Sequence, residues 1–130
     1  MYCADTSSWI AYLSGETGGD VDELDSHLHD RSIRMAPMVL AELLSDPTLP
    51  AQVEKLLLGI PLLELTEGFW KRAGKLRALL IRQNLRPKLV DTLIAQFCLD
   101  HKLPLYTRDT DFRPFAKYQG LQLRLHGSVN

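Results

Sequence analysis

Five acidic side chains of this chain occupy positions at which carboxylates can do chemistry. Each lies just after an expected strand or in a helix flanked by apolar residues: Asp5, Glu42, Asp91, Asp109 and Asp111. Two carboxylates about 4 Å apart repel each other by roughly 4 kcal/mol at an effective dielectric constant of 20. A cluster of such groups therefore requires a cation. Carboxylate ligands without His or Cys favour Mg²⁺ or Mn²⁺ over Zn²⁺.

Each acid taken alone also has a plain structural explanation. Asp5 could cap the helix that follows it, and the helix dipole favours an acid such as Asp91 near a helix start. Asp109 and Asp111 could be ordinary turn residues. Glu42 is the one charge in an apolar helix, where an ionised carboxylate facing a core costs several kcal/mol unless it is paired or metal-bound. The joint pattern, rather than any single acid, indicates a shared metal site.

Short apolar segments alternate with helical patterns along the chain. This order predicts an α/β fold with a mainly parallel sheet, whose ligand site lies beyond the carboxyl ends of the strands. Strands are expected at residues 1–4, 33–36, 62–65, 103–107 and 121–125, and helices at 9–13, 20–28, 37–46, 50–58, 67–84, 89–99 and 113–118. The 130 residues fit a single domain, 1–130.

Local signals predict where helices start and which faces they bury. Polar residues 6–8 are expected to cap the first helix, and Thr66 the long helix over 67–84. The acids of the second helix, from Asp20 onward, are expected to face solvent, and Trp70 to lie in the core.

The bulk composition indicates a protein of the reducing cytoplasm. The two cysteines form no disulfide framework, no signal peptide is recognisable, and no apolar run is long enough to span a membrane. The formal net charge of −1 hides an acidic segment, 16–30, and a basic segment, 68–90. The basic segment could bind a polyanion such as RNA through Lys71, Lys75, Arg82, Arg86 and Lys88, although a solvated helix face is its ordinary explanation.

Four short motifs resemble those of the PIN domain, and in particular the VapC-like toxins of bacterial toxin–antitoxin pairs. They are Asp5-Thr6-Ser7, Leu40-Ala41-Glu42-Leu43, Asp91-Thr92-Leu93-Ile94-Ala95 and Thr107-Arg108-Asp109-Thr110-Asp111-Phe112. The motifs follow the order seen in the family and cover nearly the whole chain.

This resemblance implies a three-layer α/β domain and a Mg²⁺- or Mn²⁺-dependent endoribonuclease. It matches Asp5, Glu42, Asp91 and Asp109 to the acidic quartet of the family, with Asp5, Asp91 and Asp109 as metal ligands and Asp111 as a candidate further ligand. It places Ser7 and Thr107 as hydrogen-bonding supports. It also implies a homodimer and a cognate antitoxin that covers the site.

Two other interpretations stay open at this point. A phosphatase-type metal hydrolase also uses paired aspartates, but it places the pair after the first strand, whereas Asp109 and Asp111 follow a late one. A PIN-like module that binds RNA or a partner without cleavage is the non-enzymatic alternative.

Overall fold

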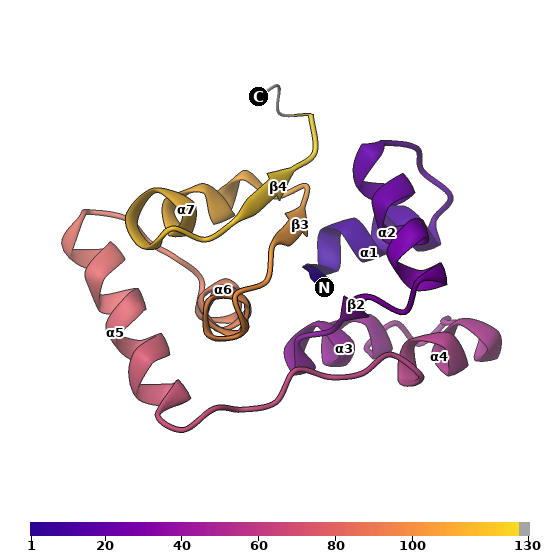
Figure 1. Cartoon of the computed structure of the whole chain (residues 1–130), viewed down its shortest axis with the longest axis horizontal. Helices are drawn as coiled ribbons and strands as arrows, with labels where there is room; N and C mark the ends of the chain where they lie inside the picture. The colour runs from indigo at the N-terminus through magenta and orange to yellow at the C-terminus, as the bar shows by residue number, and fades with distance from the viewer. Residues whose placement is uncertain (128–130) are drawn as a thin grey trace.

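A parallel β-sheet lies between two groups of helices in the computed structural model, which describes residues 1–127 (Figure 1). Its strands are β1 (Tyr2–Ala4), β2 (Ile33–Arg34), β3 (Leu105–Thr107) and β4 (Leu123–Leu125), in the order β2-β1-β3-β4. All three pairings are parallel. The expected α/β class with a mainly parallel sheet is confirmed.

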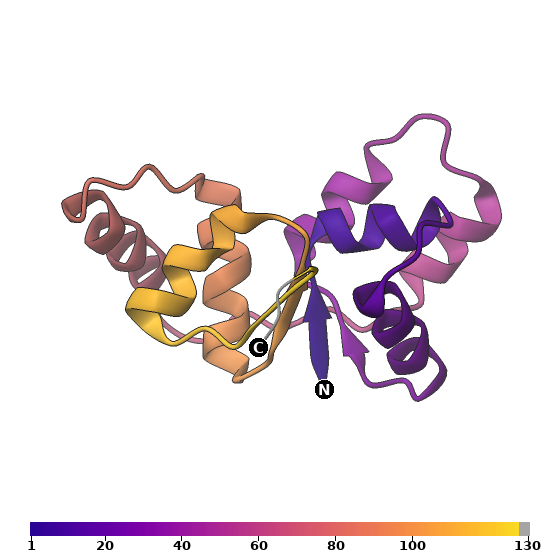
Figure 2. The same cartoon turned by 90° about the horizontal axis from the view of Figure 1, so that it is seen from above.

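Helices cover both faces of this sheet. They are α1 (Thr6–Leu13), α2 (Gly19–His29), α3 (Pro37–Leu44), α4 (Ala51–Leu58), α5 (Phe69–Arg82), α6 (Leu89–His101) and α7 (Arg113–Gln119), with a short 3-10 turn, η1 (Thr110–Phe112), before α7. Figure 2 shows α1 to α4 on one side of the strands and α5 to α7 on the other. Within residues 1–127, no helix has the length and apolar character needed to cross a bilayer.

Helices α5 and α6 form the larger part of the core on their side of the sheet. Phe69 of α5 packs against Phe97 of α6 with ring centroids 4.4 Å apart. Burying such a side chain contributes about 1.5–3 kcal/mol. The predicted stripe of α5, which is Phe69, Ala73, Leu76 and Leu80, is buried, as are most central residues of α6. Packing against α5 and the sheet therefore fixes α6, the helix that carries Asp91.

The strand expected at 62–65 is wrong. Only Leu62 forms a β-bridge, with Met35, and the hydrogen bonds there are Met35 N–H to Pro61 O and Leu63 N–H to Met35 O. Leu65 is 57% exposed, so the segment leaves the sheet edge after one bridge.

Residues 6–8 and Thr66 do not cap the helices that they were expected to cap, whereas the capping role considered for Asp5 is confirmed. The N-cap of α1 is Asp5, whose carboxylate accepts a hydrogen bond from Ser8 N. The helix therefore begins at residue 6, among the residues expected to cap it. Gly68, with φ of +79°, precedes α5, and the hydroxyl of Thr66 donates to Asp100 instead of capping.

Two side chains lie on the opposite face from the one expected. Asp20 is 5% exposed rather than solvent-facing, and Trp70 is 63% exposed rather than buried. Asp20 tolerates burial because Arg108 pairs with it. Trp70 packs edge-on against Phe69, with ring centroids 5.0 Å apart, while most of its surface remains in solvent.

Candidate metal centre

The sheet register brings the start of the chain next to its late acidic turn. Cys3 pairs with Leu105, and Ala4 with Tyr106. Asp5 N–H donates to Tyr106 O at 3.0 Å, so Asp5 stands beside Thr107 at the carboxyl ends of β1 and β3. The sequence placed the site at these strand ends, and the structure has Asp5 there.

Hydrogen bonds hold the Asp5 carboxylate on both oxygens. Oδ1 accepts from the Ser7 hydroxyl at 2.7 Å and from Ser8 N at 3.2 Å, and Oδ2 accepts from the Thr107 hydroxyl at 2.8 Å. Burial raises the pKa of Asp5 above its ordinary value, the bonds from Ser7 and Thr107 partly offset this, and the charge of Asp109 raises it again. Asp5 is thus fixed in position by the two residues expected to support it.

The same hydroxyls also shape the turn after β3. Arg108 N–H donates to Ser7 Oγ, and Asp109 N–H donates to Thr107 Oγ1, each at 3.0 Å. The Asp109 carboxylate in turn caps η1 by accepting from Asp111 N at 2.8 Å. One hydrogen-bonded chain therefore connects Asp5 to Asp109 and Asp111.

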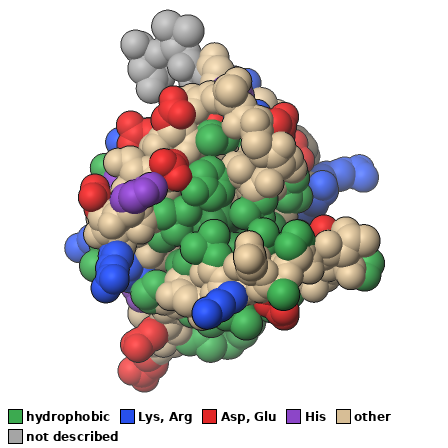
Figure 3. All heavy atoms as spheres, turned by 90° about the vertical axis from the view of Figure 1, so that its right-hand side faces the viewer, with side chains coloured by type: hydrophobic (Ala, Val, Ile, Leu, Met, Phe, Trp, Pro, Cys, Tyr) green, Lys and Arg blue, Asp and Glu red, His purple; other side chains and the backbone are tan. Residues whose placement is uncertain are grey.

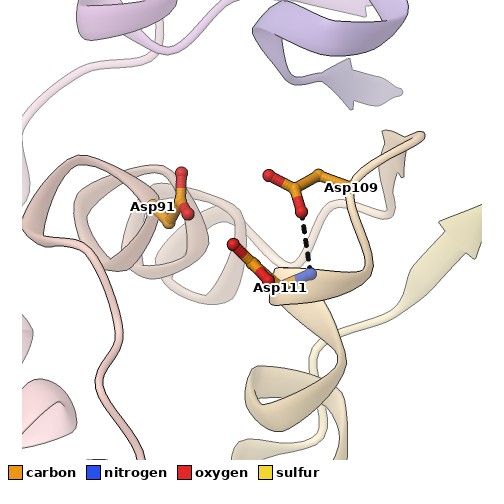
Figure 4. Close-up of side chains that lie close together, drawn as sticks. All are labelled: Asp91, Asp109 and Asp111. Carbon is orange, nitrogen blue, oxygen red and sulfur yellow. Dashed lines mark hydrogen bonds between the residues drawn. The ribbon is translucent and has the colours of Figure 1, made fainter.

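Three carboxylates converge beyond the strand ends. Asp91 from the first turn of α6, Asp109 from the turn after β3 and Asp111 from η1 each offer an oxygen within 4.8 Å of the others. Figure 4 shows the three side chains pointing toward one another from these separate elements. The structure thus brings Asp111, expected only as a candidate further ligand, into the same cluster as Asp91 and Asp109.

The carboxylate of Asp91 has a raised pKa and one oxygen without a hydrogen-bond donor among the described residues. Burial first, and then the charge of Asp109, raise its pKa to about 6, while Lys88 acts in the opposite direction. Its Oδ2 is buried and has no hydrogen-bond partner among the described residues. A buried acceptor left without a donor costs about 1–3 kcal/mol, and more when charged. A bound cation would satisfy this oxygen.

The donor set fits a hard divalent cation. Asp91, Asp109 and Asp111 present only carboxylate oxygens, with Asp5 close enough to raise the pKa of Asp91. Oxygen-only ligation suits Mg²⁺ or Mn²⁺. The unpartnered Asp91 oxygen and the mutual repulsion of the acids both favour occupancy by such an ion.

Glu42 lies outside the group of acids that could share one ion in residues 1–127. It is exposed on α3, and its Oε1 accepts from the Thr6 hydroxyl at 2.8 Å. Thr6 is the first residue of α1, next to Asp5. Glu42 is therefore held through Thr6, a residue of the Asp5-Thr6-Ser7 motif for which the sequence indicated only a capping role.

An ion pair between Arg108 and Asp20, which the sequence did not indicate, holds the turn after β3 in place. Arg108 contacts Asp20 with two nitrogens, at 2.7 and 2.9 Å, and Ser8 Oγ donates to the same carboxylate at 3.2 Å. Burial alone would raise the pKa of Asp20, but the hydrogen bonds and charge of Arg108 outweigh it and hold this pKa below its ordinary value. No local pattern connects residues 88 positions apart.

The five basic residues proposed to bind RNA divide into two groups. Lys71 and Lys75 lie in the first half of α5, and Arg82 at its end. Arg86 and Lys88 lie on the loop between α5 and α6 and line a groove together with Asp111. Only this second group is next to the carboxylates.

Comparison with known proteins gives a family and a fold. A family model described as PIN domain matches residues 2–118. A chain in the crystal structure of VapBC2 from Rickettsia felis, bound to a DNA fragment from its promoter, superposes with a TM-score of 0.74 at 21% identity, covering 95% of this chain and 97% of that chain. A chain of VapBC-5 from Mycobacterium tuberculosis gives 0.61 at 16% identity, with 95% of each chain covered. No curated protein matches this chain.

Proposed function

Because this chain belongs to the PIN domain family, we propose that it is a metal-dependent endoribonuclease and the toxin of a toxin–antitoxin pair. The observation that carries the proposal is the convergence of Asp91, Asp109 and Asp111 beside the hydrogen-bonded Asp5. Such a cluster suits a site that binds Mg²⁺ or Mn²⁺ and cleaves a phosphodiester bond.

The residues of the site have three different roles in this proposal. Asp91, Asp109 and Asp111 hold the ion, and Asp5 completes the negative charge around it. When bound, the ion activates water and neutralises the phosphate that is cleaved. Ser7 and Thr107 keep Asp5 in position through hydrogen bonds of 2.7 and 2.8 Å.

Glu42 has a different task, because it stands apart from the three clustered carboxylates. The Thr6 hydroxyl donates a hydrogen bond of 2.8 Å to Glu42 Oε1. Because Glu42 is exposed, its carboxylate can also contact water or RNA at the side of the site. This position suits a proton acceptor better than a direct metal ligand.

An antitoxin is the partner that we propose. A groove of about 300 Å³ between α1 and the α3–α4 region is lined by Ile10, Leu13, Leu43 and Val53, with Glu42 and Asp46 among its lining residues. Figure 3, seen from the α2 and α4 side, shows apolar side chains gathered on this part of the surface. An apolar antitoxin segment carrying a basic residue would match both the groove and its acids. The relatives from VapBC systems support this partner.

The assembly and the compartment follow from the same proposal. A homodimer of this chain, acting on RNA in the cytoplasm, is the form in which we expect the toxin to work.

An RNA cleavage assay tests the proposed function directly. The purified protein should cleave single-stranded RNA with Mg²⁺ or Mn²⁺, and excess EDTA should abolish this cleavage. Asp5→Asn and Asp91→Asn should each remove activity while circular dichroism stays unchanged. Undiminished cleavage in both variants, or in EDTA, would contradict a metal nuclease, and binding without cleavage would indicate a module that only holds RNA.

A further inference from the structure

Two adjoining grooves lead from the acid cluster to the loop between α5 and α6. The first, of about 210 Å³, is lined by Asp111 and Thr110 on one side and by Arg86 and Lys88 on the other. The second, of about 460 Å³, continues from Arg86 along the end of α5. Leu85 and Arg86 line both grooves, so the two adjoin at this loop.

Two cations that line these grooves form no ion pair with an acidic side chain of residues 1–127. Arg86 and Lys88 are exposed, and neither forms an ion pair within residues 1–127. Arg72 and Arg108, by contrast, are held by Asp100 and Asp20. Lys88 is near enough to Asp91 to lower the pKa of that carboxyl, but neither Lys88 nor Arg86 is engaged in an ion pair, so both can contact a further anion.

The loop that carries these cations is held in place by backbone contacts. Arg77 Nε donates to Pro87 O at 3.1 Å, between Arg86 and Lys88. Leu85 N–H and Asn84 N–H donate to the last turn of α5, to Leu80 O and Ile81 O. The backbone that carries the two cations is thus held before any ligand binds, which lowers the entropy cost of ordering the loop.

Charge balance explains why the site needs cations here. Four carboxylates around one divalent ion leave two negative charges, which repel a polyanion. Arg86 and Lys88 supply two positive charges along the adjoining groove. A phosphate that approaches over them meets a neutral surface rather than an acidic one.

We propose that the phosphates of single-stranded RNA next to the cleaved bond bind Arg86 and Lys88, and that Lys71 and Lys75 take no part. This inference rests on the proposed nuclease function and specifies how its substrate is held. Lys75 precedes Arg82 by about 10 Å of helix, at 1.5 Å per residue. Neither Lys71 nor Lys75 is among the residues that line these two grooves.

Two double variants with the same change of charge test the proposal. Arg86→Gln/Lys88→Gln removes the proposed phosphate-binding cations, and Lys71→Gln/Lys75→Gln removes two exposed cations from the start of α5. Both are made in the full chain with Asp5→Asn, so that Mg²⁺ can be present without cleavage. Fluorescence anisotropy of a short labelled single-stranded RNA gives the affinity at several salt concentrations.

The first variant should bind roughly tenfold or more weakly, because charge-assisted hydrogen bonds are removed at both positions. The slope of log K against log salt should become shallower by about 0.7 for each phosphate that the protein no longer binds. The Lys71/Lys75 variant should stay within about twofold of its parent, as expected for screened charges away from the RNA. The conservative variant Arg86→Lys/Lys88→Arg should retain most of the affinity.

Equal losses of affinity in the two double variants would overturn the proposal, because they would indicate an effect of net charge alone. No loss in the Arg86/Lys88 variant, or no RNA binding by the parent, would overturn it as well. In the otherwise unmodified protein, Arg86→Gln/Lys88→Gln should raise KM for RNA more than it lowers kcat. Absence of cleavage by the protein without any substitution would refute the nuclease function. The comparison of the two double variants in the binding assay would still decide where RNA binds.

Discussion

Thr107 Oγ1 donates a hydrogen bond of 2.8 Å to Asp5 Oδ2, across 102 residues of sequence. Thr107 is fully buried, and its hydroxyl oxygen also accepts from Asp109 N at 3.0 Å. One hydroxyl therefore holds the carboxylate of Asp5 and the backbone of Asp109, two residues from opposite ends of the chain. Its loss should disturb the site without changing any acid.

Thr107→Val removes this hydroxyl while nearly keeping the shape of the side chain. We expect it to lower the free energy of unfolding by about 1–3 kcal/mol, because buried polar groups lose their partners. We also expect slower RNA cleavage, because Asp5 and Asp109 lose a common support. Urea denaturation and cleavage rates measure the two effects, and Thr107→Ser, which keeps the hydroxyl, should restore most of the cleavage rate.

Asp91→Asn should stabilise the metal-free protein at neutral pH. The pKa of Asp91 is raised to about 6, so the folded state resists ionisation of this carboxyl. The free energy of unfolding should accordingly fall as the pH rises from about 4 through 6. In EDTA at pH 7.5 the variant should melt roughly 3 to 5 °C above the unmodified protein, the shift that about 1 kcal/mol produces in a chain of this size.

The same comparison at pH 4 provides the control. There Asp91 is protonated in the folded protein, so the two melting temperatures should approach each other. Asp22→Asn, a substitution at an exposed acid of α2, should leave the melting temperature unchanged at both values. A lower melting temperature for Asp91→Asn at pH 7.5 would contradict the destabilising role given to this charge.

Metal binding should depend on Asp91 more than on Glu42. Asp91 belongs to the group of acids whose oxygens lie within 4.8 Å of one another, whereas Glu42 is bonded to Thr6 outside it. Calorimetric titration with Mn²⁺ should show affinity reduced by tenfold or more in Asp91→Asn, by about 1.4 kcal/mol or more, and little changed in Glu42→Gln. Equal reductions would place Glu42 among the ligands.

Saturation with Mn²⁺ should also raise the melting temperature. An ion at 100 times its dissociation constant stabilises the folded state by about 2.7 kcal/mol. At the same Mn²⁺ concentration this increase should fall to about half or less in Asp91→Asn, since a tenfold weaker site is stabilised by about 1.4 kcal/mol, and an equal increase in that variant would refute a site built on Asp91.

Breaking the ion pair behind the turn should be more costly than loss of a surface charge. Arg108→Gln leaves the carboxylate of Asp20, 5% exposed, without its permanently charged partner and with the His126 ring at 3.2 Å as its remaining ion-pair contact. We expect a loss of about 2–4 kcal/mol in urea denaturation, toward the range for broken buried pairs. The pKa of Asp20 is lowered by Arg108, so the stability from this pair should be present at neutral pH and lost as the pH falls below about 4.

Arg108→Lys keeps the charge but not the paired hydrogen bonds from two nitrogens, so its stability should fall between those of Arg108→Gln and the parent. Arg124→Gln, at an exposed position of β4, is the matched control and should cost under about 0.5 kcal/mol. A loss in Arg108→Gln no larger than in this control would show that the pair does not anchor the turn.

Most elements of the fold could be predicted because their signals are local. The stripe of α5 from Phe69 to Leu80 repeats at helical spacing, and the apolar run of α6 indicated a helix packed in the core. The prediction of a strand at residues 62–65 was wrong because an apolar run does not reveal whether a neighbouring strand is available to pair with it. The predicted burial of Trp70 was wrong because side-chain type alone does not determine which helix face packs against the core.

The acids that could form the site were identifiable from the amino-acid order, since acids after strands and at helix starts point to the carboxyl ends of a parallel sheet. The folded structure was needed to show that Asp111 joins Asp91 and Asp109, whereas Glu42 is hydrogen-bonded to Thr6 outside this group. It alone paired Asp20 with Arg108 and separated Arg86 and Lys88 from Lys71 and Lys75. Local propensity acts over a few residues, whereas carboxylate repulsion, burial and long-range ion pairs depend on distances that only the folded chain sets.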